Sequence, residues 1–132
     1  MGEQPGSPGW ADDVGTELFM TELHVVDWPA TVAWYVEVLG LRLLRTDEAR
    51  RFALLATGNG RLALRGVEAP AGPATGVRLV FLVADVDVEY ERLRSLGVEA
   101  SSPADHAREP YRETRLADPV GTPITLFAWS GL

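Results

Sequence analysis

Two stretches of the sequence decide the fold: D-W-P-A-T-V-A-W-Y-V-E-V-L-G, from Asp27 to Gly40, and D-V-D-V-E-Y-E-R-L-R-S-L-G, from Asp85 to Gly97. Each begins at an aspartate, which favours a helix start, and each ends in Leu-Gly, which favours a helix end. The second aspartate follows the first by 58 residues, and the second Leu-Gly follows the first by 57. A repeat of this length indicates two copies of one structural unit.

Short runs with strand character surround each predicted helix. They span 18–26, 41–45, 51–56 and 61–66 in the first half, and 77–83, 98–100, 111–116 and 124–128 in the second. Turn signals such as Gly58-Asn59-Gly60 separate them. We therefore expect an α+β fold of two tandem β-α-β-β-β modules, at 16–67 and 76–130, with a linker at 68–75. Because each module has a one-faced sheet that must be covered, the modules should form a curved mixed sheet around a central cleft.

Residues 1–15 are rich in Gly, Pro and Asp and lack apolar periodicity, so we expect a flexible leader before a single domain at 16–132. The role of Trp10 in this leader is left open. The chain has no secretory signal pattern and no apolar run of the ~18 residues that a membrane helix needs. These features predict a cytoplasmic protein that does not bind membranes.

The charged residues exclude several kinds of chemistry. The chain has 12 basic residues against 19 acidic ones, a net charge of −7, and every basic residue is an arginine. Without lysine there is no Schiff base, and without cysteine there is no disulfide, thiol nucleophile or thiolate metal site. The negative charge disfavours nucleic acid. Its excess lies in residues 1–41, which hold no basic residue, and fits a solvated acidic tail or, less well, a field that attracts cationic ligands.

Two motifs resemble one known family. They are V-x-D-x-P-A-x-V-x-W-Y-V-x-x-L-G, from Val25 to Gly40, and Y-R-E-T-R-L-A-D-P-V-G-T-P-I-T, from Tyr111 to Thr125. The chain resembles the vicinal oxygen chelate superfamily from Leu18 to Trp129. That superfamily includes glyoxalase I, extradiol dioxygenases, and fosfomycin and bleomycin resistance proteins. The motifs look most like the bleomycin-binding branch, which implies bacterial antibiotic resistance and a homodimer with clefts shared between subunits.

The resemblance also bears on metal binding. The positions that hold metal ligands in relatives correspond here to Met20, Leu79, Thr125 and a residue near Leu64. None of these side chains suits a hard or borderline divalent metal, so we expect neither a metal nor another cofactor. A replacement site built on Glu22 and His24 is less favoured, because two ligands on one strand are too few and the other histidine, His106, lies in a polar loop.

Strand alternation predicts which residues line the cleft and bind a ligand. These are Met20, Glu22 and His24 in the first strand, Leu79, Phe81 and Val83 in the fifth, Tyr111 and Arg112 in the seventh, and Thr125, Phe127 and Trp129 in the last. The alternative for each aromatic residue is an ordinary place in the core. Asp27 and Asp85 are expected to cap helices and Asp118 to close a turn. Glu89–Arg92 and Glu91–Arg94 should pair on the solvent face of the second helix.

The expected function is metal-independent binding, or sequestration, of a small aromatic or cationic molecule. The alternative is a cofactor-free isomerase, lyase or cyclase with His24 as general base and Glu22 as the group that orients it. His24 could equally orient a ligand through a hydrogen bond. A glyoxalase- or dioxygenase-type metalloenzyme is the least favoured function.

Overall fold

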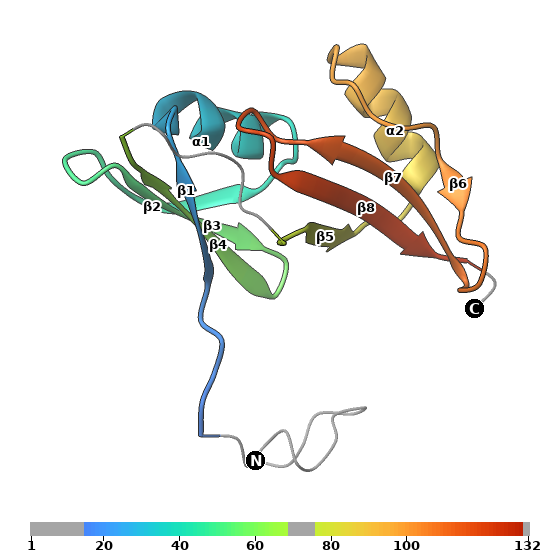
Figure 1. Cartoon of the computed structure of the whole chain (residues 1–132), viewed down its shortest axis with the longest axis horizontal. Coiled ribbons are helices and arrows are strands. Elements are labelled where there is room, and N and C mark those ends of the chain that lie inside the picture. Colours follow the sequence, from blue (N-terminus) through green and yellow to red (C-terminus); the bar gives the residue numbers. More distant parts are fainter. Residues whose placement is uncertain (1–14, 69–75, 131–132) are drawn as a thin grey trace.

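The computed structural model describes residues 15–68 and 76–130 (Figure 1). The predicted leader therefore lies outside the described residues except for Gly15. The predicted linker lies outside them except for Glu68. The elements in chain order are β1 (Thr21–Val25), α1 (Trp28–Glu37), β2 (Arg42–Asp47), β3 (Phe52–Thr57), β4 (Gly60–Gly66), β5 (Leu79–Leu82), α2 (Val86–Ser95), β6 (Ala104–Asp105), β7 (Tyr111–Ala117) and β8 (Pro123–Trp129).

The two halves of the chain build matching four-stranded sheets. The strand order is β1-β4-β3-β2 in the first sheet and β5-β8-β7-β6 in the second. β1 pairs in parallel with β4, and β5 in parallel with β8, whereas the other neighbours are antiparallel. The predicted α+β fold with two β-α-β-β-β modules is confirmed. Neither helix in the described part of the chain is long and apolar enough to cross a membrane.

One predicted strand is wrong. Residues 98–100 form no strand, and the short strand of this region is β6, at Ala104–Asp105. The connecting segment is held to β7 through Ser101, whose N–H donates to the Arg115 carbonyl at 2.9 Å. The Ser101 hydroxyl accepts from the Arg115 N–H at 2.9 Å, so a side chain makes a bond that a strand ladder would make through backbone. Pro103, which has no N–H, then interrupts the segment.

The two helices differ at their starts. Asp85 caps α2, because its Oδ1 accepts a hydrogen bond from the Val88 N–H at 3.2 Å. Asp27 makes no such bond. Asp27 holds the predicted N-cap position of α1, where its carbonyl accepts from the Thr31 N–H at 3.0 Å, but a side-chain cap is confirmed for Asp85 only.

α2 ends at the predicted Leu-Gly, with Leu96 as its C-cap, whereas α1 ends slightly earlier, at Glu37 with Val38 as its C-cap. Gly40 and Gly97 each have a φ of 76°, the left-handed conformation that glycine adopts without strain. After α2, the Gly97 N–H donates to the Arg94 carbonyl and the Val98 N–H to the Leu93 carbonyl, both at 2.9 Å. This pair of bonds satisfies the last carbonyls of the helix and turns the chain away from its axis.

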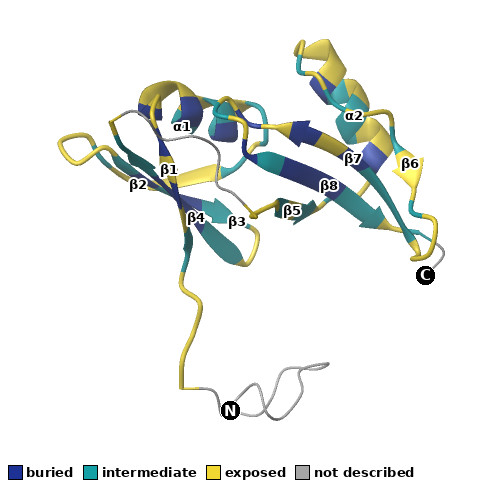
Figure 2. Cartoon of the chain, viewed as in Figure 1, coloured by how far each residue is buried: buried dark blue, intermediate teal, exposed yellow. Residues whose placement is uncertain are grey.

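Each sheet has one face that a helix covers. Both helices lie on the same side of the two sheets (Figure 1), and the buried residues gather beneath them (Figure 2). The buried core consists of alternate strand residues and the inner residues of the helices: Leu23, Val25, Leu55, Leu62, Leu64, Leu116, Ile124 and Leu126 with Trp28, Tyr35 and Leu93. The opposite side of each sheet is covered by no helix in the described residues. We call these two surfaces the first and second open faces.

Candidate functional site

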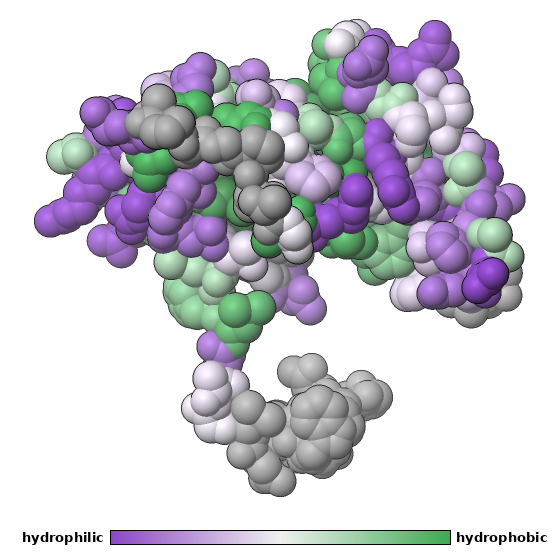
Figure 3. Space-filling model, viewed as in Figure 1, coloured by the Kyte–Doolittle hydropathy of each residue, from purple (hydrophilic) through white to green (hydrophobic). Residues whose placement is uncertain are grey.

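The hydrogen-bond register assigns each residue of the first sheet to a face. Directly paired residues of neighbouring strands point to the same side of a sheet. The first open face is therefore made of Glu22 and His24 in β1, Arg61, Ala63 and Arg65 in β4, Phe52, Leu54 and Ala56 in β3, and Arg42, Arg45 and Asp47 in β2. Hydrophilic residues dominate the outer edges of both modules, and hydrophobic residues show between the modules (Figure 3).

Glu22 and His24 form the polar centre of the first open face. His24 Nε2 lies 2.9 Å from Glu22 Oε2, and Arg65 Nε lies 3.4 Å from the same oxygen. The hydrogen bond from His24, with help from the charge of Arg65, holds the pKa of Glu22 below its ordinary value against the effect of partial burial. The predicted proximity of Glu22 and His24 is therefore confirmed. The Glu22 carboxylate can therefore orient the imidazole ring of His24, whose side chain is 56% exposed.

Met20, the third residue predicted in this strand, is half-buried and lies one residue before β1 begins. The sequence did not identify Arg65 as a neighbour of Glu22. That contact depends on the parallel pairing of β1 with β4, which places His24 opposite Arg65.

The second open face carries a group of aromatic rings, which we call the aromatic cluster: Tyr111, Phe127 and Trp129. Their ring centroids lie 5.8 Å apart for Tyr111–Phe127, 6.3 Å for Tyr111–Trp129 and 5.0 Å for Phe127–Trp129, each pair edge to face. Trp129 is 53% exposed. All three were predicted to line one site, and the pairing of β7 with β8 brings them together. His106, which the sequence placed in a polar loop, stacks on Tyr111 at 4.6 Å.

Thr125 also lies on the second open face, but its hydroxyl is occupied. Arg78 Nη1 donates to Thr125 Oγ1 at 3.1 Å, and Thr125 is buried. Close by on the same face, Arg115 pairs with Glu113 at 3.3 Å. Sequence reasoning missed Arg78, because it lies before β5 in the chain and reaches Thr125 only once β5 and β8 are paired.

The predicted residues of β5 lie on the other side of the sheet. Leu79 pairs with Ile124 and Phe81 with Leu126, and these β8 residues are buried in the core with Leu93 of α2. Val83, just after β5, also packs against that core. The prediction that Leu79, Phe81 and Val83 share one face with Thr125, Phe127 and Trp129 is therefore wrong. The β5 residues that do share that face are Val80 and Leu82.

Arg112 also lies on the helix-covered side of its sheet. Its Nε and Nη2 each donate to a carboxylate oxygen of Asp87 in α2 at 3.0 Å, and Nη1 donates to Asp105 at 3.2 Å. These bonds hold the pKa of Asp87 below its ordinary value. Because adjacent residues of a strand point to opposite faces, Arg112 lies on the other face from Tyr111, and its side chain pairs with neighbouring carboxylates there.

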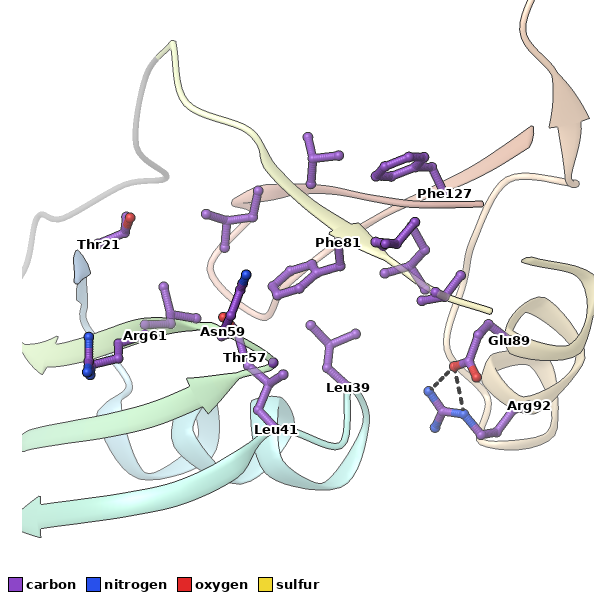
Figure 4. A pocket seen from close by; sticks show the side chains of 17 residues that line it. Thr21, Leu39, Leu41, Thr57, Asn59, Arg61, Phe81, Glu89, Arg92 and Phe127 are labelled. Carbon is purple, nitrogen blue, oxygen red and sulfur yellow. Dashed lines mark hydrogen bonds and ion pairs between the residues drawn. The ribbon is translucent and has the colours of Figure 1, made fainter. Parts of the chain in front are cut away.

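A cavity of about 680 Å³ lies between the two modules. Leu39 and Leu41 lie on one side of it, and Phe81 and Phe127 lie across from them (Figure 4). Four of the predicted residues line this cavity: Leu79, Phe81, Val83 and Phe127. They come from both faces of the second sheet, because the cavity lies at its edge strand, β5. Its size falls within the range of small-molecule sites. Phe127 belongs to both the cavity and the aromatic cluster.

The polar residues of this cavity were not predicted. Thr57 at the end of β3, Asn59 in the turn that follows and Arg61 in β4 reach it. Glu89 and Arg92 reach it from α2, where Arg92 donates to Glu89 Oε1 at 2.8 and 3.1 Å (Figure 4). This pair was expected on the solvent face, but it lines the cavity. The other expected pair, Glu91–Arg94, spans 3.8 Å on the exposed side of the helix.

The four positions that correspond to metal ligands in relatives do not come together. Leu64 is fully buried beneath α1, and Leu79 lies on the opposite side of its sheet from Thr125. Their neighbours on the open faces, Ala63 and Val80, have no atom that binds a metal. Among the described residues, no three His, Cys, Asp or Glu side chains are placed to hold one ion. These residues therefore do not fit a divalent metal centre of the relatives' kind.

Comparison with known proteins gives a consistent result. The family model described as "Glyoxalase/Bleomycin resistance protein/Dioxygenase superfamily" matches residues 18–126. A solved glyoxalase/bleomycin resistance protein/dioxygenase from Nocardioides is 27% identical, with a TM-score of 0.67 and coverage of 92% of this chain and 90% of that one.

Two further solved structures are similar in fold. They are lactoylglutathione lyase from Agrobacterium tumefaciens (18% identity, TM-score 0.69, coverage 86% and 93%) and the fosfomycin resistance protein FosX from Listeria monocytogenes (16%, 0.73, 89% and 97%). No curated protein matches the chain.

Proposed function

The chain belongs to the glyoxalase/bleomycin resistance protein/dioxygenase superfamily, and from this premise we propose that it binds and sequesters a small aromatic molecule without a metal ion. The observation that carries the proposal is the aromatic cluster on the second open face. Its rings meet edge to face, and Trp129 keeps about half of its surface exposed. Edge-to-face rings hold one another in place and leave the face of the outermost ring available for stacking.

The surroundings of the aromatic cluster support binding of a molecule rather than an ordinary core. Val80 and Leu82 lie on the same face and are 57% and 62% exposed, so a broad apolar surface faces outward. An exposed apolar patch of this kind marks an interaction site. Phe127 connects this surface with the cavity between the modules, which offers space for the rest of a ligand.

Metal independence is the second part of the proposal. It is supported by the side chains at the relatives' ligand positions, because Leu79 faces the core and so does Leu64, near which the remaining position lies. Thr125 is the one position that offers an oxygen, and its hydroxyl already accepts a hydrogen bond from Arg78. We expect titration with zinc, nickel or manganese to leave ligand affinity unchanged. Tight stoichiometric uptake of one of these metals would contradict this part.

The experiment that tests binding uses N-phenyl-1-naphthylamine, a neutral aromatic probe whose fluorescence rises in apolar surroundings. Trp129→Ala should weaken its binding by the ~1–3 kcal/mol of one aromatic stack, about 5- to 150-fold. Val88→Ala, an exposed aliphatic side chain on α2, is the matched control and should have no effect. A wild-type protein that does not bind the probe, or a Trp129→Ala variant with unchanged affinity, would contradict the proposal.

Sequestration is distinguished from catalysis by the fate of the ligand. Native mass spectrometry of the protein after exposure to a panel of aromatic natural products, bleomycin included, should detect a complex from which the ligand is recovered unaltered. Recovery of a chemically changed ligand would favour an enzyme instead.

The hydrogen bond between His24 and Glu22 favours a second candidate function, a cofactor-free isomerase, lyase or cyclase. In that reaction His24 would take a proton from the substrate and Glu22 would orient its ring and stabilise its charged form. His24→Ala should then lower turnover ~10²–10⁴-fold with little change in substrate affinity. For a binding protein, the same variant should leave every product assay unchanged and cost at most the ~1 kcal/mol of one hydrogen bond in affinity.

We also propose that the protein is a homodimer whose clefts are shared between subunits, as the family resemblance implies. Val80 and Leu82 give the second open face an apolar surface that a second copy could cover in part. Sedimentation equilibrium should give the mass of a dimer for the wild type. Leu82→Glu should shift the equilibrium toward monomer, and a monomeric wild type would contradict this assembly.

A further inference from the structure

The open faces carry a charge opposite to that of the whole chain. The net charge of the protein is −7. The open faces nevertheless hold more basic than acidic side chains: Arg42, Arg45, Arg61, Arg65, Arg78 and Arg115 against Glu22, Asp47 and Glu113. The acidic excess therefore lies on other parts of the molecule.

Ion pairs neutralise only part of this positive charge. Arg65 pairs with Glu22, and Arg115 pairs with Glu113. Asp47, the third acid, pairs with Arg50 from the following turn. Four arginines of the open faces remain without a carboxylate within 4 Å in residues 15–68 and 76–130: Arg42, Arg45, Arg61 and Arg78.

Among these four, Arg61 is the one that lines the cavity between the modules. Its guanidinium lies 4.2 Å from the centroid of the Phe19 ring, and Nη1 donates to the Phe19 carbonyl at 3.1 Å. Both partners are uncharged, so they hold the guanidinium in position without neutralising it. Arg92, the other cation of the cavity, is already paired with Glu89.

The geometry points to a ligand that carries an anionic group, such as a carboxylate, sulfonate or phosphate, next to its aromatic part, with Arg61 as the residue that binds the anion. This inference rests on the proposed function and specifies its ligand class. Leu39, Leu41, Phe81 and Phe127 provide the apolar walls of the same cavity (Figure 4). A planar guanidinium donates two parallel hydrogen bonds to a carboxylate or phosphate. This ligand class differs from the cationic alternative that the sequence left open.

Two probes with the same ring framework test this inference. One is 8-anilinonaphthalene-1-sulfonate, and the other is the neutral N-phenyl-1-naphthylamine, which lacks the sulfonate. The wild type should bind the sulfonate more tightly, and this preference should shrink as salt rises from ~10 to ~500 mM because salt screens charges. Arg61→Gln should weaken binding of the sulfonate about 10-fold or more and leave binding of the neutral probe unchanged. Arg61→Lys, which keeps the charge, should recover part of the affinity.

Arg94→Gln is the matched control, because Arg94 is an exposed arginine on α2 that does not line the cavity, and it should affect neither probe. Equal weakening of both probes by Arg61→Gln would overturn the inference, since it would assign Arg61 a structural role through Phe19. Sulfonate affinity that is unchanged in Arg61→Gln would also overturn it. If Trp129→Ala still weakened both probes in that case, the proposed function would stand without the anionic ligand.

Failure of both probes to bind the wild type would overturn the inference together with the proposed function. Should Arg61→Gln not fold, as judged by circular dichroism, the Arg61→Lys variant and the salt dependence of the wild type decide the question. A sulfonate preference that does not change with salt would then count against a role for charge.

Discussion

The Tyr35 hydroxyl donates a 2.7 Å hydrogen bond to Asp118 Oδ2, and this bond joins the helix of the first module to the last turn of the second. Both residues are buried. The other carboxylate oxygen, Oδ1, accepts from the backbone N–H groups of Val120 and Thr122 at 3.0 and 2.8 Å, which confirms the predicted turn role of Asp118. One side chain therefore closes the turn before β8 and also fixes that turn against α1.

Removing this hydroxyl should destabilise the protein. Tyr35→Phe leaves a buried carboxylate oxygen without its donor, which costs about 1–3 kcal/mol of unfolding free energy. For a chain of this length, each kcal/mol lowers the melting temperature by roughly 4 °C. Tyr90→Phe, at a half-buried position on α2, is the control and should melt like the wild type. Identical melting curves for Tyr35→Phe and the wild type would show that the bond does not stabilise the junction.

The same residue should make the protein sensitive to alkali. Burial, with the nearby Asp118 carboxylate, raises the pKa of Tyr35 far above its ordinary value of 10.0. Above pH ~10 the unfolded chain loses this proton while the folded protein keeps it, so unfolding free energy should fall by up to ~1.4 kcal/mol per pH unit. Urea titrations between pH 8 and 11 should show this slope in the wild type. In Tyr35→Phe the slope should be shallower, and equal slopes would argue against a buried neutral tyrosine.

The Glu22–His24 contact can be measured directly. The hydrogen bond from His24 is the largest cause of the lowered pKa of Glu22. His24→Ala should therefore raise the pKa of Glu22 toward its ordinary value, as followed by carboxyl carbon NMR during acid titration. Because the lowered pKa stabilises the fold only above that ordinary value, the variant should lose stability at pH 7 and match the wild type near pH 2. A Glu22 pKa that does not move on substitution would remove the basis for His24 as an oriented base.

Substitution of Arg112 separates structural from ligand-binding arginines. Arg112→Gln breaks the paired hydrogen bonds to Asp87 and should allow the pKa of Asp87 to rise. Because these bonds are exposed, the loss of unfolding free energy should be small. Affinity for both naphthyl probes should be unchanged, since Arg112 lies on the helix-covered side of its sheet. A large loss of probe affinity in Arg112→Gln would show instead that Arg112 contributes to the binding site.

Gly66 allows α1 to approach β4 closely. A Cβ atom at this position would lie 2.8 Å from Arg51 Cβ and 3.0 Å from Trp28 Cβ. Gly66→Ala should therefore cost ~1–3 kcal/mol through overpacking, measured by urea unfolding. Gly15→Ala, where a Cβ would meet nothing within 4 Å, is the matched control and should be neutral. Equal stability of the two variants would indicate that β4 relaxes without penalty.

Much of the fold could be predicted from the sequence because its signals are local. A C-terminal glycine such as Gly97 acts within one helical turn, and the turn before β4 is encoded in adjacent residues. Alternation in β1 separated Glu22 and His24 from buried Leu23 and Val25, because that strand is polar on one side only. The aromatic cluster was predictable for the same reason. Tyr111, Phe127 and Trp129 alternate with residues of the other face, and both strands belong to one antiparallel pair.

The sequence by itself determined the repeat, the elements and the ends of the helices, and it excluded lysine and cysteine chemistry. Tertiary structure decided which residues meet. Both faces of β5 are apolar, so the sequence of this strand does not show which face is turned toward a cavity. Only its pairing with β8 places Val80 opposite Thr125 and turns Leu79 and Phe81 toward α2. That Arg61 has no carboxylate within 4 Å among residues 15–68 and 76–130 likewise depends on distances between residues far apart in the chain. Local patterns specify backbone and faces, whereas partners across a sheet depend on register, which forms only when the strands pair.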